Sequence, residues 1–271
     1  MPELPEVETT LRGIKSHIIH QKIVDIVIRH PHLRWPIPPQ LKAELLHQTV
    51  QRLYRRGKYI LFEFKSGTLI LHLGMSGRLR ILSAKEPPQK HDHIDICFDN
   101  KKTLRFTDPR RFGALLWTRE SIDEHPLLKD IGREPLTATF NGQYLYEHAR
   151  GRKSAVKTYI MDSKIVAGVG NIYATEALFE ARLHPLKAAG NITLAQYEKL
   201  ADAIKIILKK AIKKGGTTLK DFMKSDGSPG YFSIELKAYG HAGEPCPRCQ
   251  TALKLTRIGQ RSTVFCPKCQ R

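Results

Sequence analysis

The chain has 271 residues, of which 41% are hydrophobic, so it can form more than one compact domain. Lys and Arg number 45 against 26 Asp and Glu, and this net charge of +19 favours a polyanionic partner, nucleic acid before a membrane surface. The acidic start MPELPEVETT does not resemble a secretory signal, and no apolar run reaches the ~18 residues of a membrane helix. We therefore expect a cytoplasmic protein without membrane contact.

The first half of the chain is predicted to be rich in strands. A helix is expected over 5–19, because Val7, Leu11 and Ile14 recur at spacings that share one helical face. A second, short helix is expected near 38–47. Alternating apolar and polar residues predict strands at 22–28, 50–56, 58–64, 68–73, 78–82, 93–98, 103–107 and 113–117. Such a series is typical of a sandwich or barrel.

Helices dominate the pattern after about residue 120. They are predicted at 141–149, 153–162, 171–182 and 194–214, and the last begins with a capping box of Thr193 and Gln196. Residues 217–240, rich in Gly, Ser and Lys, predict a long loop. We expect an α+β protein with a β-rich domain at 1–125, a linker at 126–140, a helical domain at 141–235 and a cysteine module at 236–271.

Four cysteines near the C-terminus form two CxxC pairs with 16 residues between them: Cys246, Cys249, Cys266 and Cys269. In a cytoplasmic protein this spacing indicates a metal site rather than disulfides. Four thiolates satisfy tetrahedral Zn²⁺ and leave no open position, so one structural zinc ion is expected.

The segment between the cysteine pairs, KLTRIGQRSTVF, predicts a β-hairpin with Gly259 in its turn. Arg257 and Arg261 would flank that turn. A finger presenting arginine suits contact with a phosphate backbone, and the alternative is a solvated charged turn.

Pro2 and Glu3 precede the first predicted helix. Removal of Met1 would leave a secondary amine, whose pKa of ~7.7–8.0 allows a neutral fraction near pH 7. Our hypothesis is that Pro2 attacks a sugar carbon as a Schiff-base nucleophile, with Glu3 as general acid or base. The alternative, which composition alone favours, is that Pro-Glu is only a lead into the helix.

Three further segments carry residues suited to nucleic acid. HLGMSG (72–77) holds Met75 in a tight turn, and DPRRFG (108–113) places Arg110 beside Phe112, as in proteins that wedge apart stacked bases. Taken alone, Phe112 suits a core position better. GVGN (168–171) offers backbone N–H groups at a helix start, where phosphate binds.

Together these segments resemble the bacterial formamidopyrimidine-DNA glycosylases. The matching motifs occur in the same order over essentially the whole chain: PELPEVET, RGKYI (56–60), HLGMSG, DPRRFG, MDSKIVAGVGNIYATEALF (161–179), GGTTLKDF (215–222), SDGSPGYF (225–232) and the four-Cys finger. The resemblance implies an N-terminal catalytic β-sandwich, a helical domain with a helix–two-turn–helix over 153–182, and a zinc finger. It also implies a monomer.

The same resemblance implies a bifunctional base-excision repair enzyme acting on double-stranded DNA. Such an enzyme removes oxidised purines, including 8-oxoguanine and formamidopyrimidines, and cleaves the strand at the abasic site by β- and δ-elimination. It assigns Pro2 as the nucleophile and Glu3 as the donor to the departing base or sugar. Lys58 would donate a proton in β-elimination, and Arg261 would serve δ-elimination.

The resemblance further implies DNA contacts. Met75, Arg110 and Phe112 would fill the gap left by the extruded base, with Arg110 pairing with the orphaned cytosine. The loop 217–240 would form a lid over the lesion. Backbone contacts are implied for five residues, namely His91, Arg152, Lys157, Asn171 and Lys220.

Two other functions remain open from the sequence. One is a glycosylase of the endonuclease VIII type, which prefers oxidised pyrimidines; the PELPEVE start and DPRRFG favour the purine enzyme. The other is a non-enzymatic DNA-binding protein using only the finger and the basic surface. It accounts for the charge and the cysteines but not for Pro2 next to Glu3.

Overall fold

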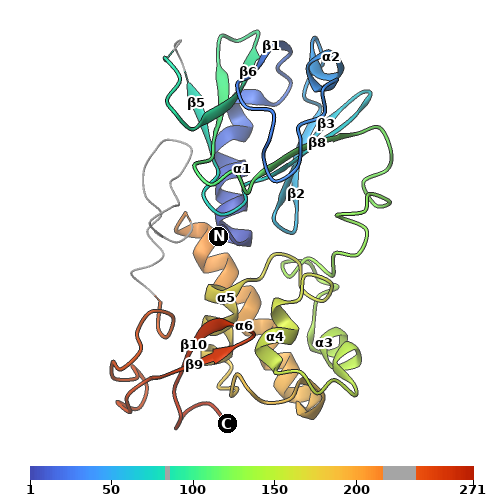
Figure 1. Cartoon of the computed structure of the whole chain (residues 1–271). Coiled ribbons are helices and arrows are strands. Elements are labelled where there is room, and N and C mark those ends of the chain that lie inside the picture. The colour runs from blue at the N-terminus through green and yellow to red at the C-terminus, as the bar shows by residue number, and fades with distance from the viewer. Residues whose placement is uncertain (83–85, 216–235) are drawn as a thin grey trace. The chain divides into compact units, whose positions relative to one another are not determined.

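The computed structural model describes residues 1–82, 86–215 and 236–271 (Figure 1). The chain divides into two compact units, the first built mainly from residues 1–129 and the second from residues 130–213 and 236–271. The segments predicted to form the helical domain and the cysteine module thus fall in one unit. The predicted loop 217–240 lies mostly outside the described residues.

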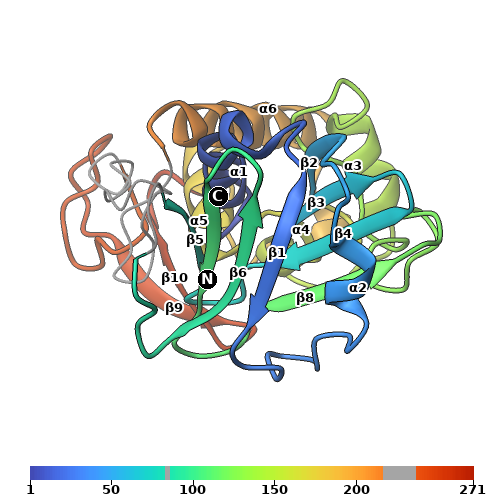
Figure 2. The ribbon, with the colours of Figure 1, turned by 90° about the horizontal axis from the view of Figure 1, so that it is seen from above.

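The first unit contains two four-stranded antiparallel sheets, which Figure 2 shows as separate groups of strands. The first sheet has the order β1 (Ile23–Ile28), β6 (Asp92–Phe98), β7 (Thr103–Thr107) and β5 (Arg78–Leu82). The second has the order β2 (Arg52–Arg56), β3 (Tyr59–Phe64), β4 (Gly67–His72) and β8 (Ala114–Thr118). The two sheets form the predicted β-sandwich.

Helix α1 (Leu4–Ile18) joins the two sheets through its apolar face. Val7, Leu11 and Ile14 are at most 5% exposed and belong to one hydrophobic cluster with Phe62 of β3 and Phe106 of β7. Burial of large side chains contributes about 1.5–3 kcal/mol each, so this cluster fixes the start of the chain against both sheets. The short helix α2 (Leu41–Leu45) begins later than predicted, after two successive prolines, Pro38 and Pro39.

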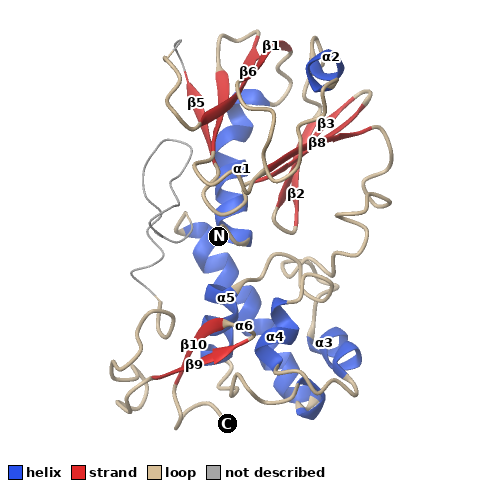
Figure 3. Ribbon diagram, in the orientation of Figure 1, coloured by secondary structure: helices blue, strands red, loops and turns tan. Residues whose placement is uncertain are grey.

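The second unit is mainly helical, as Figure 3 shows. Its elements are α3 (Gly142–Ala149), α4 (Val156–Met161), α5 (Asn171–Glu180), the 3₁₀ turn η1 (Ala189–Asn191), α6 (Leu194–Lys213), β9 (Lys254–Ile258) and β10 (Arg261–Phe265). Helix α6 packs on α3 and α5, and β10 packs on α5. No described helix combines the length and apolarity needed to cross a membrane.

The predicted elements are confirmed with small shifts at their ends. Helix α4, like α2, begins three residues later than predicted: it was predicted from residue 153 and begins at Val156. Ala155 forms a β-bridge with Ala188, and the backbone N–H of Val156 donates to the Lys187 carbonyl. These distant backbone partners hold the chain extended, so the local helical pattern does not take effect until residue 156.

Candidate active site and DNA-binding surfaces

Pro2 and Glu3 are buried at the start of α1. Glu3 is the N-cap residue of α1, and it is only 3% exposed. Its backbone N–H donates to Glu6 Oε2 over 2.9 Å. This bond fixes Pro2, one residue earlier, near the positive end of the helix dipole, which disfavours protonation of a nearby amine.

Lys58 lies in the tight turn between β2 and β3. Gly57 precedes it with a φ of +58°, a conformation that glycine adopts without strain. Arg55 supports the turn, because its guanidinium donates to the Gly57 carbonyl over 2.9 Å and to Glu8 Oε2 of α1 over 3.1 Å. Arg55 thus links the helix that begins next to Pro2 with the turn that carries Lys58.

A pocket of about 510 Å³ brings Met1 together with Met75 and Phe112, two of the three predicted wedge residues. It is lined by Met1, Leu33, Arg34, His72, Gly74, Met75, Arg111 and Phe112. Its lining is mostly apolar, as expected of a site that receives a planar ring. The start of the chain and the two turns of HLGMSG and DPRRFG therefore face one cavity.

His72 is the titratable histidine of this pocket. Burial lowers its pKa to about 4, and the positive charges of Lys58 and Arg34 act in the same direction. The imidazole is therefore neutral at pH 7, and its Nδ1 accepts the Gly74 N–H over 2.9 Å. The proton consequently resides on Nε2.

The wedge residues are exposed to different degrees. Phe112 is 46% exposed, so the prediction of a core position, drawn from its residue type alone, is wrong. The Arg110 guanidinium lies 4.9 Å from the centre of the Phe112 ring, and Met75 is half-buried. An exposed aromatic ring stacked by a cation is poised to contact bases. His91 is half-buried, and its carbonyl accepts the backbone N–H of Asp108, the first residue of the DPRRFG segment that holds Arg110 and Phe112.

In the second unit, Asn171 is the first residue of α5 and follows Gly170, its N-cap. Its side-chain Oδ1 is buried and finds no hydrogen-bond partner among the described residues. The N-terminus of a helix suits a phosphate, because its first N–H groups point along the axis and carry a partial positive charge. Arg152 is exposed; its Nε donates to the His148 carbonyl, and its guanidinium lies 5.3 Å from the centre of the Tyr159 ring.

Lys157 is not placed as a surface cation. It is 1% exposed, and its Nζ donates to the Ser262 carbonyl over 3.1 Å and to Thr263 Oγ1 over 2.6 Å. The ammonium therefore ties α4 to strand β10, a link that sequence reasoning missed. Nothing local in the sequence indicates it, because the partners lie more than 100 residues away.

The four cysteines gather in one cluster at the end of the chain. Their sulfur atoms all lie within 4.8 Å of one another. Tetrahedral zinc with Zn–S bonds of ~2.3 Å separates its sulfurs by a little under 4 Å, so the cluster fits the ion. The chain carries a structural Zn²⁺ site with Cys246, Cys249, Cys266 and Cys269 as ligands.

The strands β9 and β10 form the hairpin that the sequence predicted between the cysteine pairs. Gly259 has a φ of +53° in its turn, and the pairing joins Arg261 with Ile258 and Arg257 with Ser262. Arg257 and Arg261 are both exposed. Lys220, the remaining predicted DNA contact, lies outside the described residues.

Family models match nearly the entire chain. Residues 1–115 match the formamidopyrimidine-DNA glycosylase N-terminal domain, residues 131–223 its H2TH domain, and residues 243–271 a zinc finger found in FPG and IleRS. The formamidopyrimidine-DNA glycosylases of Saccharophagus degradans and Methylococcus capsulatus are 54% and 53% identical over 271 residues, which cover 100% of both chains.

Solved structures give the same relationship. A complex of the Lactococcus lactis Fpg with DNA containing an abasic site is 37% identical, with a TM-score of 0.89 over 99% of both chains. The MutM (Fpg) protein of Thermus thermophilus is 35% identical, with a TM-score of 0.88 over 99% of this chain and 98% of that one. The present chain therefore belongs to the formamidopyrimidine-DNA glycosylase family.

Proposed function

We propose that the protein is a bifunctional base-excision repair enzyme for double-stranded DNA that holds an oxidised purine. It releases 8-oxoguanine and formamidopyrimidines and then cleaves the strand as an abasic-site lyase. The observation that carries the proposal is a pocket whose lining includes Met1, Met75 and Phe112, in a chain of this family. One solved relative of 37% identity, the Lactococcus lactis Fpg, was bound to DNA containing N7-benzyl-Fapy-dG, which supports this substrate class.

The first step uses the amine that the removal of Met1 frees on Pro2. Its lone pair forms a bond to C1′ of the damaged nucleotide, and the glycosidic bond breaks with its electron pair passing to the base. Glu3 supplies the proton that the departing base or the opening sugar ring requires. The nitrogen then loses its proton, and the C1′–O4′ bond breaks as O4′ takes up a proton. The product is an iminium ion between Pro2 and the opened sugar.

The iminium then draws electrons from the sugar. Loss of a C2′ proton forms a C1′–C2′ enamine, and the C3′–O bond breaks to expel the 3′ phosphate; Lys58 is the assigned proton donor in this step. A second elimination expels the 5′ phosphate, for which Arg261 is the assigned donor or phosphate clamp. Water finally hydrolyses the iminium and regenerates the Pro2 amine.

Extrusion of the base precedes this chemistry and costs a few kcal/mol. We assign Met75, Arg110 and Phe112 to the space that the base vacates, with Arg110 hydrogen-bonded to the orphaned cytosine. His91, Arg152, Asn171 and Lys220 are assigned to the DNA backbone. The zinc finger presents Arg261, and the metal contributes by holding the hairpin folded. We also propose the bacterial cytoplasm as its location, because the relatives come from bacteria and the proposed substrate is chromosomal DNA.

The substrate class is tested with two duplexes that differ only in the lesion. We expect release of 8-oxoguanine opposite cytosine to exceed release of thymine glycol by at least about tenfold in kcat/KM. A preference for thymine glycol would favour the endonuclease VIII type. Tight binding without cleavage of either duplex, with Met1 verified as absent, would leave a DNA-binding protein.

A further inference from the structure

Two loops of the first unit carry the predicted wedge residues, and buried polar groups connect them. We call residues 73–77 the first wedge loop, which holds Met75, and residues 108–113 the second wedge loop, which holds Arg110 and Phe112. The loops are more than 30 residues apart in sequence. Their relative position is therefore set by contacts across the fold.

Asp108 lies at the centre of the connection. Its side chain is fully buried, with 0% exposure. Its Oδ1 accepts the hydroxyl of Ser76 in the first wedge loop over 2.7 Å, and its Oδ2 accepts the Gly113 N–H in the second over 2.8 Å. The two oxygens of one carboxyl group thus bind one loop each.

Ser76 completes the connection in the opposite direction. Its hydroxyl has a single hydrogen, which goes to Asp108, and its oxygen accepts the backbone N–H of Arg110 over 3.2 Å. The bonded groups stand next to every wedge residue: Ser76 follows Met75, Gly113 follows Phe112, and the Arg110 bond is made by Arg110 itself. Loss of any of these three hydrogen bonds would therefore shift the backbone that carries the wedge residues.

Packing and a second brace leave the loops little freedom. A Cβ atom on Gly74 would lie 2.3 Å from the Phe112 carbonyl carbon, so the two loop backbones touch. His93, which is 5% exposed, places Nε2 2.8 Å from the Asp108 carbonyl and holds the second loop against β6. The wedge loops are thus fixed by polar bonds within a buried environment, where such bonds are costly to lose.

We propose that Asp108 and Ser76 are positioning residues that hold Met75, Arg110 and Phe112 as one wedge and so set the rate of lesion extrusion and the preference for the opposite base. The inference rests on the proposed function and deepens it. Both residues are buried, with Asp108 0% and Ser76 7% exposed, so we assign them no direct contact with the reacting sugar. A mutation away from the reacting atoms that misplaces a functional group by about 1 Å can lower the reaction rate about 100-fold.

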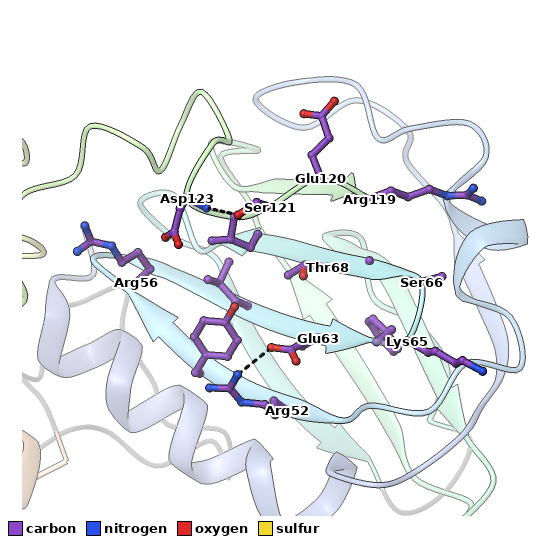
Figure 4. Close-up of a pocket in the computed structure, with 15 residues that line it drawn as sticks. Arg52, Arg56, Glu63, Lys65, Ser66, Thr68, Arg119, Glu120, Ser121 and Asp123 are labelled. Atoms are coloured by element: carbon purple, nitrogen blue, oxygen red, sulfur yellow. Dashed lines mark hydrogen bonds and ion pairs between the residues drawn. The ribbon is translucent and has the colours of Figure 1, made fainter.

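The test uses Ser76→Ala and Asp108→Asn, together with a matched control pair from the same unit. Asp123 donates its backbone N–H to Ser121 Oγ in a surface hollow beside β2–β4 (Figure 4). No residue of either wedge loop lines this hollow. Ser121→Ala and Asp123→Asn remove the same chemical groups without touching the wedge. Both controls should behave as the wild type.

Two measurements separate extrusion from chemistry. The first is single-turnover release of 8-oxoguanine from duplexes with cytosine or adenine opposite, and the second is borohydride trapping on a single-stranded abasic oligonucleotide, which needs no wedge. We expect duplex release to fall about tenfold in Ser76→Ala and about 100-fold in Asp108→Asn. Trapping should stay within about twofold of wild type, and the rate ratio between cytosine and adenine should shrink.

The outcomes are distinct. Equal losses in duplex release and in single-stranded trapping would show a general structural effect and overturn the positioning role. Unchanged duplex release in Ser76→Ala would overturn it as well, and this variant retains the buried carboxyl group if Asp108→Asn does not fold. Absence of trapping in the wild type would instead overturn the proposed function, and the inference with it.

Discussion

The wedge loops and the zinc finger are both short segments that present arginine, yet they are held by different forces. The loops rely on the hydrogen bonds that the Asp108 side chain accepts from the Ser76 hydroxyl and the Gly113 N–H, each of which contributes about 1 kcal/mol. The finger relies on four sulfur atoms within 4.8 Å of one another, and zinc binding to such sites supplies about 10–16 kcal/mol. The finger should therefore be either folded with zinc or unfolded without it. The wedge loops, in contrast, should lose stability in small steps as single hydrogen bonds are removed.

Zinc removal tests the all-or-none side of this comparison and should have the largest effect. Chelation is expected to abolish strand cleavage and to expose the backbone amides of residues 243–271 to hydrogen exchange. The amides of the wedge loops should keep their protection, because no metal holds them. A finger that stays protected after the metal is gone would contradict the comparison.

Gly74→Ala tests how closely the wedge loops approach each other. Gly74 has a φ of +67°, and an added Cβ would meet the Phe112 backbone at 2.3 Å. We expect a loss of about 3 kcal/mol in unfolding free energy, from backbone strain and the clash together. Gly151→Ala is the control, since its φ is +72° and nothing lies within 4 Å. Equal losses in the two variants would show that the close approach is unimportant.

Lys157→Met tests the link between α4 and the finger. Because the ammonium bonds Ser262 and Thr263, its loss should lower the unfolding free energy by about 2 kcal/mol. The slope of log affinity for DNA against log salt, expected near about −4.5 for about five phosphates, should not change. A slope that becomes less negative by about 0.9, with stability intact, would instead identify Lys157 as a phosphate contact. Lys199→Met, on the exposed face of α6, serves as the control.

His72→Asn should give the smallest effect, confined to acid pH. The folded state holds the pKa of His72 near 4, below its ordinary value of 6.5, so acid favours the unfolded chain, which binds the proton. The contribution is complete above pH 6.5 and is lost as the pH falls to about 4. Asn can still accept the Gly74 N–H. We would measure the free energy of unfolding by denaturant at about pH 7.5 and about pH 4.5. Between these pH values it should fall by about 1–2 kcal/mol less in the variant than in the wild type. An equal fall in both proteins would refute this role of His72.

The same comparison explains what the sequence could predict. The Cys spacing predicted the zinc site, since two cysteines with two residues between them can bind one metal ion from a single tight turn. Alternating and apolar residues predicted the strands, although β4, β6 and β7 are buried along most of both faces. The Asp108–Ser76 connection, the Arg55 support of the Lys58 turn and the burial of Lys157 could not be predicted, because they depend on contacts between elements distant in the chain.

Residue type alone also misled at one position. An isolated phenylalanine is best placed in a core, yet Phe112 is 46% exposed, and its ring lies against the Arg110 guanidinium. The neighbouring Arg110 and Arg111 were the signal, since two cations next to an aromatic ring suit a nucleic-acid surface better than a core.

The most direct test of the account is covalent trapping of Pro2. The purified protein, with Met1 verified as absent, is incubated with a duplex holding one 8-oxoguanine opposite cytosine, reduced with borohydride, digested and mapped by peptide mass. We predict one DNA adduct, on the amine of Pro2, and no adduct in Pro2→Gly on the same timescale. An adduct on a lysine, or cleavage with no trapped intermediate, would contradict the assignment of Pro2 as the nucleophile.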